Sequence, residues 1–190
     1  VLGPLVAKYG KARIALPGGC AIGTRPVNFH LDALKKLGAK IVLKNGYIEA
    51  SAKKLIGTNI NFEGITVTGT ENIMMAATLA EGRTIIKNAA KEPEIIDLAN
   101  MLTSMGAKIK GAGNETIIIE GVTNLTGTEF DIPADRIEAG TYLAAAAVTK
   151  GNITIEGINP TRLMKVIDKL KTAGAMTVSY THLRAHETVG

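Results

Sequence analysis

The sequence predicts a mixed α/β fold built from repeated units, each with the order strand, helix, strand, helix, strand, strand. Gly38, Gly106 and Gly174 recur at intervals of 68 residues, and each is followed by Ala. Each of these glycines ends a segment with helical periodicity, where a glycine in the left-handed conformation closes the last turn. Two further pairs of stretches recur in the same order, namely 77–86 with 146–155 and 55–58 with 125–128. Repetition at a nearly fixed interval is typical of a chain built from copies of one supersecondary unit.

The first repeat shows the local signals of these elements. A helix is predicted over 28–37, because apolar residues recur at helical spacing on one face, namely Val27, Leu31, Leu34 and Leu37. Strands are predicted over 40–44 and 47–51, because they flank Asn45-Gly46, a dipeptide typical of a two-residue hairpin turn. Residues 1–8 have the pattern of a helix that is already under way.

The second repeat contains the whole order of elements. Its pattern predicts a strand, a helix, a strand, a helix and two strands over 60–67, 71–81, 83–87, 92–106, 108–110 and 116–120. The first of these helices is rich in Ala and Met and is closed by Gly82. The second begins at Glu92-Pro93, because proline suits the first turn and acidic residues favour the helix dipole there. Units of this kind bury one sheet face under helices and must pack on copies of themselves.

Composition and charge narrow the classes of function. The 190 residues carry a net charge of +5 and contain one cysteine and no tryptophan. Residues 1–54 hold ten Lys or Arg against two acids, which favours a partner with phosphate groups. The scarcity of aromatic residues argues against a single-stranded nucleic-acid binder, which needs rings for base stacking. A basic nucleic-acid binder stays an alternative, and its binding would depend steeply on salt.

The same composition bears on the compartment. One cysteine excludes a disulfide within the chain and fits a reducing environment. No apolar run reaches the roughly 18 residues that a membrane-spanning helix needs. We therefore expect a cytoplasmic protein with no membrane partner.

The chain's only cysteine lies in a glycine-containing loop, Pro17-Gly-Gly-Cys-Ala-Ile-Gly-Thr-Arg-Pro-Val27. Cys20 is followed five residues later by Arg25, and a thiol becomes reactive when it is accessible and lies in an electropositive setting. The glycines let the backbone adopt conformations closed to other residues and let a ligand approach closely. The alternative is that Cys20 is a small buried apolar residue, as many free cysteines are.

This loop resembles the active-site loop of the enolpyruvyl transferases that act on UDP-N-acetylglucosamine. The resemblance covers residues 1–176 and continues through three further motifs in the family's order, at 76–82, 88–95 and 135–141. It implies an inside-out α/β barrel, in which three βαβαββ units per domain surround a pseudo-threefold axis with the helices inside. Residues 1–133 are then most of the first domain, which carries the catalytic loop, and 134–176 are the start of the second.

The two ends of the chain depart from this pattern. Because a helix is already under way at Val1, we expect an internal fragment of a longer enzyme. Residues 177–190 do not continue the regular spacing of apolar residues that precedes them, and they resemble a translated adapter sequence. We therefore expect a non-native tail. The alternative for the tail is a metal site, because His182 and His186 have the i, i+4 spacing. No third ligand accompanies them, and no metal is expected.

The resemblance implies a reaction and its place in the cell. The family transfers the enolpyruvyl group of phosphoenolpyruvate to the 3-hydroxyl of UDP-N-acetylglucosamine, the first committed step of peptidoglycan synthesis, and thus serves cell-wall biogenesis, cell shape and cell division. It works by addition and elimination as a monomer without a cofactor. Cys20 matches the general acid that fosfomycin alkylates. Other parts of the family's site match no residue of this chain, so the fragment itself is expected to be inactive.

Two segments match the family's nucleotide-sugar contacts. The first is Arg25, Pro26, Val27, Asn28 and Phe29, which runs into a helix N-terminus, where free N–H groups favour phosphate. Arg25 can also bind a phosphate bidentately. Asn28 stands where the family often has Asp, and its alternative role is the N-cap of the helix. The second segment is Gly64, Ile65, Thr66 and Val67, whose alternative is a plain amphipathic strand.

Two other interpretations stay open beside the basic nucleic-acid binder. The nearest is a shikimate-pathway enolpyruvyl transferase, against which the cysteine loop and the Arg-Pro-Val segment speak. Another is a non-catalytic β/α module that binds phosphorylated ligands, in which Cys20 would be unreactive and indifferent to nucleotide sugar. Within the family interpretation, His30 is expected to be a hydrogen-bonded histidine rather than a catalyst.

Overall fold

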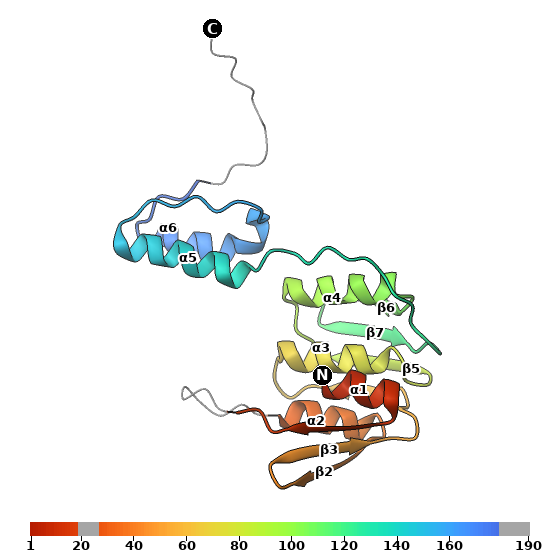
Figure 1. Cartoon of the computed structure of the whole chain (residues 1–190). Coiled ribbons are helices and arrows are strands. Elements are labelled where there is room, and N and C mark those ends of the chain that lie inside the picture. Colours follow the sequence, from red (N-terminus) through yellow and green to blue (C-terminus); the bar gives the residue numbers. More distant parts are fainter. Residues whose placement is uncertain (19–26, 179–190) are drawn as a thin grey trace. The chain divides into compact units, whose positions relative to one another are not determined.

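The computed structural model describes residues 1–18 and 27–178, which fall into two compact units (Figure 1). The first unit is Val1–Phe130 and the second begins at Asp131. The division lies near the boundary predicted after residue 133, whose assignment to two domains of a longer fold stays a prediction. Cys20, Arg25, Pro26 and residues 179–190 of the predicted tail, which include its two histidines, lie outside the described residues.

The first half of unit 1 contains two helices and a three-stranded antiparallel sheet. Its elements are α1 (Leu2–Tyr9), β1 (Lys11–Ala15), α2 (Asn28–Lys36), β2 (Lys40–Lys44) and β3 (Tyr47–Ser51). The strand order is β1-β3-β2. The β2–β3 turn is the predicted two-residue hairpin, because Asn45 and Gly46 both have positive φ, 51° and 75°, as the turn that matches strand twist requires.

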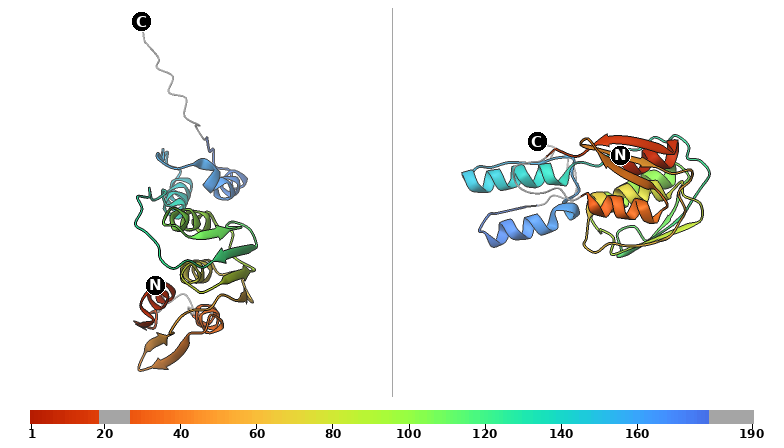
Figure 2. Two further views of the ribbon diagram at one scale, coloured as in Figure 1. Left: turned by 90° about the vertical axis from the view of Figure 1, so that its right-hand side faces the viewer. Right: turned by 90° about the horizontal axis from the view of Figure 1, so that it is seen from below.

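The second half of unit 1 has the full βαβαββ order that the repeat predicts. Its elements are β4 (Asn59–Asn61), α3 (Val67–Ala77), β5 (Arg83–Lys87), α4 (Pro93–Ser104), β6 (Lys108–Lys110) and β7 (Thr116–Glu120). The strand order is β4-β5-β7-β6, in which β4 and β5 are parallel and the other pairs antiparallel. Figure 2 shows the helices of this unit lying along one side of its sheets.

The strand predicted over 60–67 is wrong beyond Asn61. Thr66 is instead the N-cap of α3, and its Oγ1 accepts a hydrogen bond of 3.1 Å from the Gly69 amide. Thr70 adds a second bond, because its hydroxyl donates to the Thr66 carbonyl at 2.7 Å. A threonine at this position satisfies backbone groups that a helix start leaves free, so the helix begins four residues earlier than predicted.

The three equally spaced glycines end their helices in the same way. Gly38, Gly106 and Gly174 have φ of 95°, 101° and 92°. In each case the glycine amide donates to the carbonyl three residues earlier, and the following alanine amide donates to the carbonyl five residues earlier, at 2.9–3.0 Å. This is the Schellman pattern, which satisfies the last carbonyls of a helix. The repeat therefore holds at the level of hydrogen bonds.

Gly106→Ala is expected to lower the free energy of unfolding by about 1 kcal/mol, because an L-residue is strained at this φ although space is open around the position. Gly106→Asn should cost less, since asparagine tolerates the left-handed conformation better. Urea denaturation followed by far-UV circular dichroism measures both. Equal losses for the two variants would contradict the conformational explanation.

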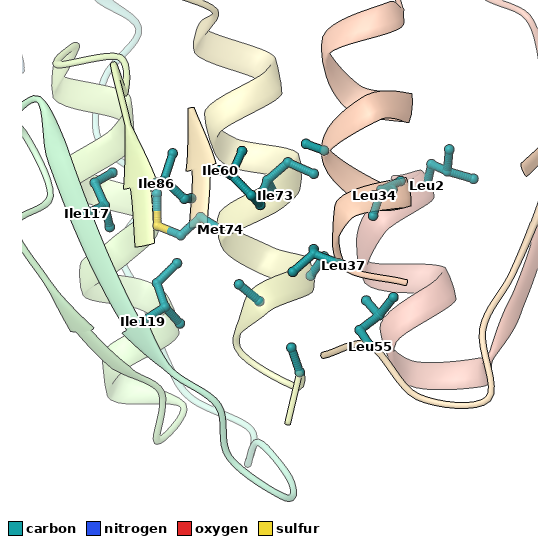
Figure 3. Packing of buried hydrophobic residues seen from close by; sticks show 14 of the residues in the cluster. Leu2, Leu34, Leu37, Leu55, Ile60, Ile73, Met74, Ile86, Ile117 and Ile119 are labelled. Carbon is teal, nitrogen blue, oxygen red and sulfur yellow. The ribbon is translucent and has the colours of Figure 1, made fainter. Parts of the chain in front are cut away.

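One apolar core fills the space between the helices and the two sheets of unit 1. Figure 3 shows the isoleucines of the second sheet, Ile60, Ile86, Ile117 and Ile119, facing Met74 of α3. On the other side of α3 lie Leu34 of α2, Leu37 at the C-cap of α2, and Leu2 of α1. All of these side chains are at most 4% exposed. Helix α3 is thus central, and its N-terminal end is fixed relative to α2.

Unit 2 contains two helices and a short 3-10 turn in its described part. Helix α5 (Arg136–Thr149) begins at Asp135, whose Oδ1 accepts from the Ile137 amide at 2.7 Å. The 3-10 turn Pro160–Leu163 leads into α6 (Met164–Thr172). The stretch 152–155, which aligns with β5, forms no strand here, because the described residues of this unit offer it no neighbouring strand.

Candidate functional site

Four of the seven predicted nucleotide-sugar residues that the structure describes line one hollow of unit 1. Its volume is about 550 Å³, and Val27, Phe29, Ile65 and Thr66 all line it. Pro17 lines it as well, so the first and last residues of the cysteine loop, Pro17 and Val27, both lie at this hollow. The hollow therefore joins the two segments that the sequence placed 35 residues apart.

An aromatic contact holds these two segments together. The rings of Phe29, on α2, and Phe62, just after β4, meet edge to face with centroids 6.4 Å apart and an interplanar angle of 85°. Gly64 lies beside the same ring, because a Cβ placed there would be 3.5 Å from Cζ of Phe29. Aromatic pairs in this geometry add stability beyond their buried area. Phe29 thus fixes the start of α2 against the loop that enters α3.

Three predicted residues do not line the hollow, namely Asn28, Gly64 and Val67. Asn28 is the first residue of α2, and it is not the N-cap, because Val27 occupies that position without a side-chain hydrogen bond. Val67 is the first residue of α3 and packs partly buried against the core. The predicted alternative role of Asn28 is therefore wrong, and the cap position is left to a residue whose side chain cannot accept a hydrogen bond.

Two helix N-termini meet at the hollow. Val27 is the N-cap of α2 and Thr66 is the N-cap of α3, and neither helix has an acidic residue in its first turn. The first amide groups of a helix lack intrahelical partners and carry partial positive charge. An anionic group in this hollow would face two such ends, which is the chemistry that phosphate binding uses in proteins.

Three polar residues of the hollow were not among the predicted site residues. His30, Thr68 and Asn72 line it, and Nε2 of His30 lies 3.5 Å from Oγ1 of Thr68. Burial, and secondly the amino group of Val1, lower the pKa of His30 below 6.5, so the ring is neutral at pH 7. The sequence does hold a signal for His30 and Thr68, since each directly follows the last residue of a predicted contact segment.

Asn72 is the most buried polar residue at the hollow, with 5% of its surface exposed. Its Oδ1 accepts a hydrogen bond of 2.9 Å from the Gly3 amide of α1. Its Nδ2 is buried and has no hydrogen-bond partner among residues 1–18 and 27–178. A buried amide group without a partner is costly, so Nδ2 is available to a polar ligand atom.

A like-charge cluster lies at the N-terminal ends of α3 and α4. Burial, and then the carboxylates of Glu94 and Glu92, raise the pKa of Glu71 above its ordinary value of 4.5. The folded state thus holds this proton more tightly than the unfolded state does. The contribution of Glu71 to stability is complete below the ordinary pKa and is lost as the pH rises through the raised folded pKa.

Glu71→Gln is therefore expected to raise the free energy of unfolding at pH 7.5, and the gain should vanish at pH 4, where the wild-type carboxyl is protonated. Urea denaturation at the two pH values measures the difference. Glu81→Gln is the matched control, because it removes an ion pair of 3.1 Å with Lys54 and should give no gain at either pH. A gain for Glu71→Gln that is equal at pH 4 and pH 7.5 would contradict the electrostatic cause.

Within the described residues, no group of three His, Cys, Asp or Glu side chains could hold a metal ion. None of the described helices has the length and apolar character needed to cross a bilayer.

Comparison with known proteins identifies the relatives of this chain. The model of the family described as EPSP synthase (3-phosphoshikimate 1-carboxyvinyltransferase) matches residues 1–188. A UDP-N-acetylglucosamine 1-carboxyvinyltransferase of Hydrogenovibrio crunogenus is 54% identical over 94% of this chain and 43% of its own length. One from Vesicomyosocius okutanii is 60% identical over 92% of this chain and 42% of its own length. The chain thus spans about two fifths of the curated relatives that it matches.

Solved structures with the same fold include two enolpyruvyl transferases. The EPSP synthase of Acinetobacter baumannii superposes with a TM-score of 0.64 at 24% identity, over 91% of this chain and 40% of that one. The enolpyruvyl transferase NikO of Streptomyces tendae gives a TM-score of 0.63 at 21% identity, over 75% of this chain and 34% of that one. At these identities the likeness concerns the fold, and it confirms the α/β class that the repeat predicts.

Proposed function

This chain belongs to the EPSP synthase family of enolpyruvyl transferases, and on that premise we propose that its protein is a UDP-N-acetylglucosamine 1-carboxyvinyltransferase. Such an enzyme transfers the enolpyruvyl group of phosphoenolpyruvate to the 3-hydroxyl of UDP-N-acetylglucosamine and releases phosphate, a step of peptidoglycan synthesis. The observation that carries the proposal is that relatives 54–60% identical over 92–94% of the chain bear this name. The shikimate-pathway alternative has less support, because these close relatives are not named for it.

The hollow of unit 1 supports a nucleotide sugar as the ligand. Its volume of about 550 Å³ lies within the usual range of small-molecule sites, roughly 300–1,000 Å³. Apolar side chains such as Phe29 and Ile65 line one part of it, and the N-terminal ends of α2 and α3 another. A diphosphate placed at the helix ends would accept hydrogen bonds from backbone N–H groups. Its binding there would not require the desolvation of a charged side chain. His30, Thr68 and Asn72 would supply neutral hydrogen-bonding groups.

Cys20 is proposed as the general acid that delivers a proton during addition to the enol carbon. A thiol serves this role when a nearby cation keeps its pKa close to the working pH, and Arg25 is the cation nearest in sequence. The same property makes the thiolate a nucleophile, so fosfomycin, an epoxide, would alkylate this residue. Arg25 and Pro26 are proposed to contact the nucleotide sugar together with the described residues 27–29 and 64–67.

The test is the intact mass of the 190-residue chain after exposure to fosfomycin, with and without UDP-N-acetylglucosamine, beside Cys20→Ala. We expect one adduct that requires Cys20 and forms faster with the nucleotide sugar. Titration of the ¹⁵N-labelled chain should then shift the amides of residues 28–30 and 67–69. An adduct that persists in Cys20→Ala, or a chain that neither forms an adduct nor binds the nucleotide sugar, would favour the non-catalytic module.

A further inference from the structure

The outer face of the first sheet carries a second hollow, separate from the proposed nucleotide-sugar site. Its volume is about 540 Å³, and the side chains around it include Lys11, Arg13, Lys40, Glu49 and Ser51. These residues alternate along β1, β2 and β3 with the inward-facing ones. Ile14 and Ile48, which face inward, line the first hollow instead. The two hollows therefore lie on opposite faces of one sheet.

One row of paired residues across this sheet has a serine in the centre and one lysine on each side of it. Ser51 of β3 is paired with Lys11 of β1 and with Lys40 of β2. Neighbouring strands are about 4.8 Å apart, so the two lysine backbones lie roughly 10 Å apart with the serine hydroxyl between them. Side chains of a row point to the same face, and long flexible lysines can both reach a group seated above Ser51.

The second sheet provides an internal comparison for this row. Its strands β5, β7 and β6 correspond to β1, β3 and β2. The corresponding row consists of Arg83 on β5, Glu120 on β7 and Lys108 on β6. There the central residue is an acid that forms an ion pair with Arg83. In the first sheet the acid is replaced by Ser51, and neither Lys11 nor Lys40 forms an ion pair within the part of the chain that the structure describes.

The other charges nearby do not compensate the two lysines. Glu49, the acid of the neighbouring row, lies 3.3 Å from Arg13. Arg13 also stacks over the ring of Tyr47, with its guanidinium carbon 3.7 Å from the ring centroid. The remaining acid of residues 1–54, Asp32, forms an ion pair with Lys35 on α2. The charge left on this face is therefore positive, with Lys11 and Lys40 on the two sides of Ser51 and Lys44 at the other end of β2.

We propose that this row binds a phosphate monoester of a small molecule, with its dianion held between the Lys11 and Lys40 ammonium groups and its oxygens in reach of the Ser51 hydroxyl. Two cations and a hydroxyl donor complement a doubly charged, acceptor-rich group. The hollow is open and lined by flexible side chains, so the site recognises the phosphate group. It is independent of the proposed transferase reaction, because it uses no residue of the nucleotide-sugar hollow.

The test titrates the ¹⁵N-labelled 190-residue chain with glycerol 3-phosphate, and in a second series with inorganic phosphate, at constant ionic strength set with chloride. We expect saturable shifts of the amides of residues 11, 40 and 51. Lys40→Gln should weaken binding about threefold to fivefold, as expected for an exposed ion pair. Ser51→Glu should abolish binding, because it installs the acid that the second sheet has in this row. Lys108→Gln is the matched control and should leave binding unchanged.

Several results would overturn the proposal. Shifts that grow linearly without saturating, or that persist in Ser51→Glu, would mean that the face attracts anions without a site. Shifts confined to residues 28–30 and 67–69 would assign the phosphate to the nucleotide-sugar hollow, which supports the proposed function instead. Should Ser51→Glu fail to fold, the double variant Lys11→Gln/Lys40→Gln takes its place, and retained binding there overturns the proposal. Equal affinity for the two ligands supports recognition of the phosphate group alone.

Discussion

Gly121→Ala is expected to lower the free energy of unfolding of unit 1 by about 3 kcal/mol or more. A Cβ at Gly121, which directly follows β7, would overlap the carbonyl oxygen of Ala80 and lie 2.8 Å from its carbonyl carbon. The obstacle is backbone, which cannot turn away as a side chain can. Two backbone hydrogen bonds lie beside this contact. The Gly121 amide donates to the Gly82 carbonyl at 2.9 Å, and the Val122 amide donates to the Thr78 carbonyl at 2.8 Å. Relief of the overlap would break both.

The matched control for this prediction is Gly127→Ala. Gly127 has no heavy atom within 4 Å of an added Cβ and lacks the positive φ that strains an L-residue, so alanine there should be neutral or slightly stabilising. Urea denaturation by far-UV circular dichroism compares the two variants. The explanation by close backbone approach is wrong if Gly121→Ala unfolds at the wild-type urea concentration.

Local patterns were sufficient to predict most of the unit 1 secondary structure. The five strands 40–44, 47–51, 83–87, 108–110 and 116–120 have the predicted bounds. Their signals are contained within a few residues, as a hairpin dipeptide, a glycine that closes a helix, or an apolar run of strand length. The repeat added the order of these elements, because one unit could be compared with another.

The failures occur where the deciding contacts are distant or absent. The stretch after Asn61 alternates like a strand, but Thr66 caps a helix, and nothing in the alternation shows which outcome prevails. The stretch 152–155 resembles β5 in sequence, yet β5 forms between β4 and β7, and the described part of unit 2 has no such neighbours. A strand depends on its partners, so its pattern alone does not produce it.

Two sequence segments of the candidate site could be predicted, but the full set of residues that line the hollow could not. The resemblance to the family predicted residues 25–29 and 64–67, and the structure brings four of the described ones together at the hollow, beside the Phe29–Phe62 contact. Asn72 could not be found in this way, because its place at the hollow follows from the packing of α1 on α3 and from a hydrogen bond to Gly3, 69 residues away.

Thr70→Val is expected to lower the free energy of unfolding by about 1–3 kcal/mol. Thr70 is fully buried, and its hydroxyl accepts a hydrogen bond of 3.1 Å from the buried Ala90 amide while donating to the Thr66 carbonyl at 2.7 Å. Valine has nearly the same shape, so the substitution leaves no large cavity. It does leave the Ala90 N–H buried without a partner, which costs the desolvation of that group.

Thr84→Val makes the same chemical change, but it is not expected to lower the free energy of unfolding. Thr84 of β5 is also fully buried, but its Oγ1 has no hydrogen-bond partner among the described residues. Removing a buried hydroxyl that lacks a partner should leave the free energy of unfolding unchanged or raise it by up to about 1 kcal/mol. Urea denaturation of the two variants in parallel separates the loss of a hydrogen bond from the loss of a hydroxyl as such.

The effect of Thr70→Val should extend to the candidate site. Thr66 begins α3 and lines the hollow, whereas Ala90 lies in the segment that enters α4, so the Thr70 hydroxyl joins the two helix entrances. Once that link is lost, the first amides of α3 are less well fixed, and binding of UDP-N-acetylglucosamine should weaken in Thr70→Val but not in Thr84→Val. Calorimetric titration well below the unfolding transition measures this. Equal affinities in the two variants would mean that the link stabilises the fold without positioning the site.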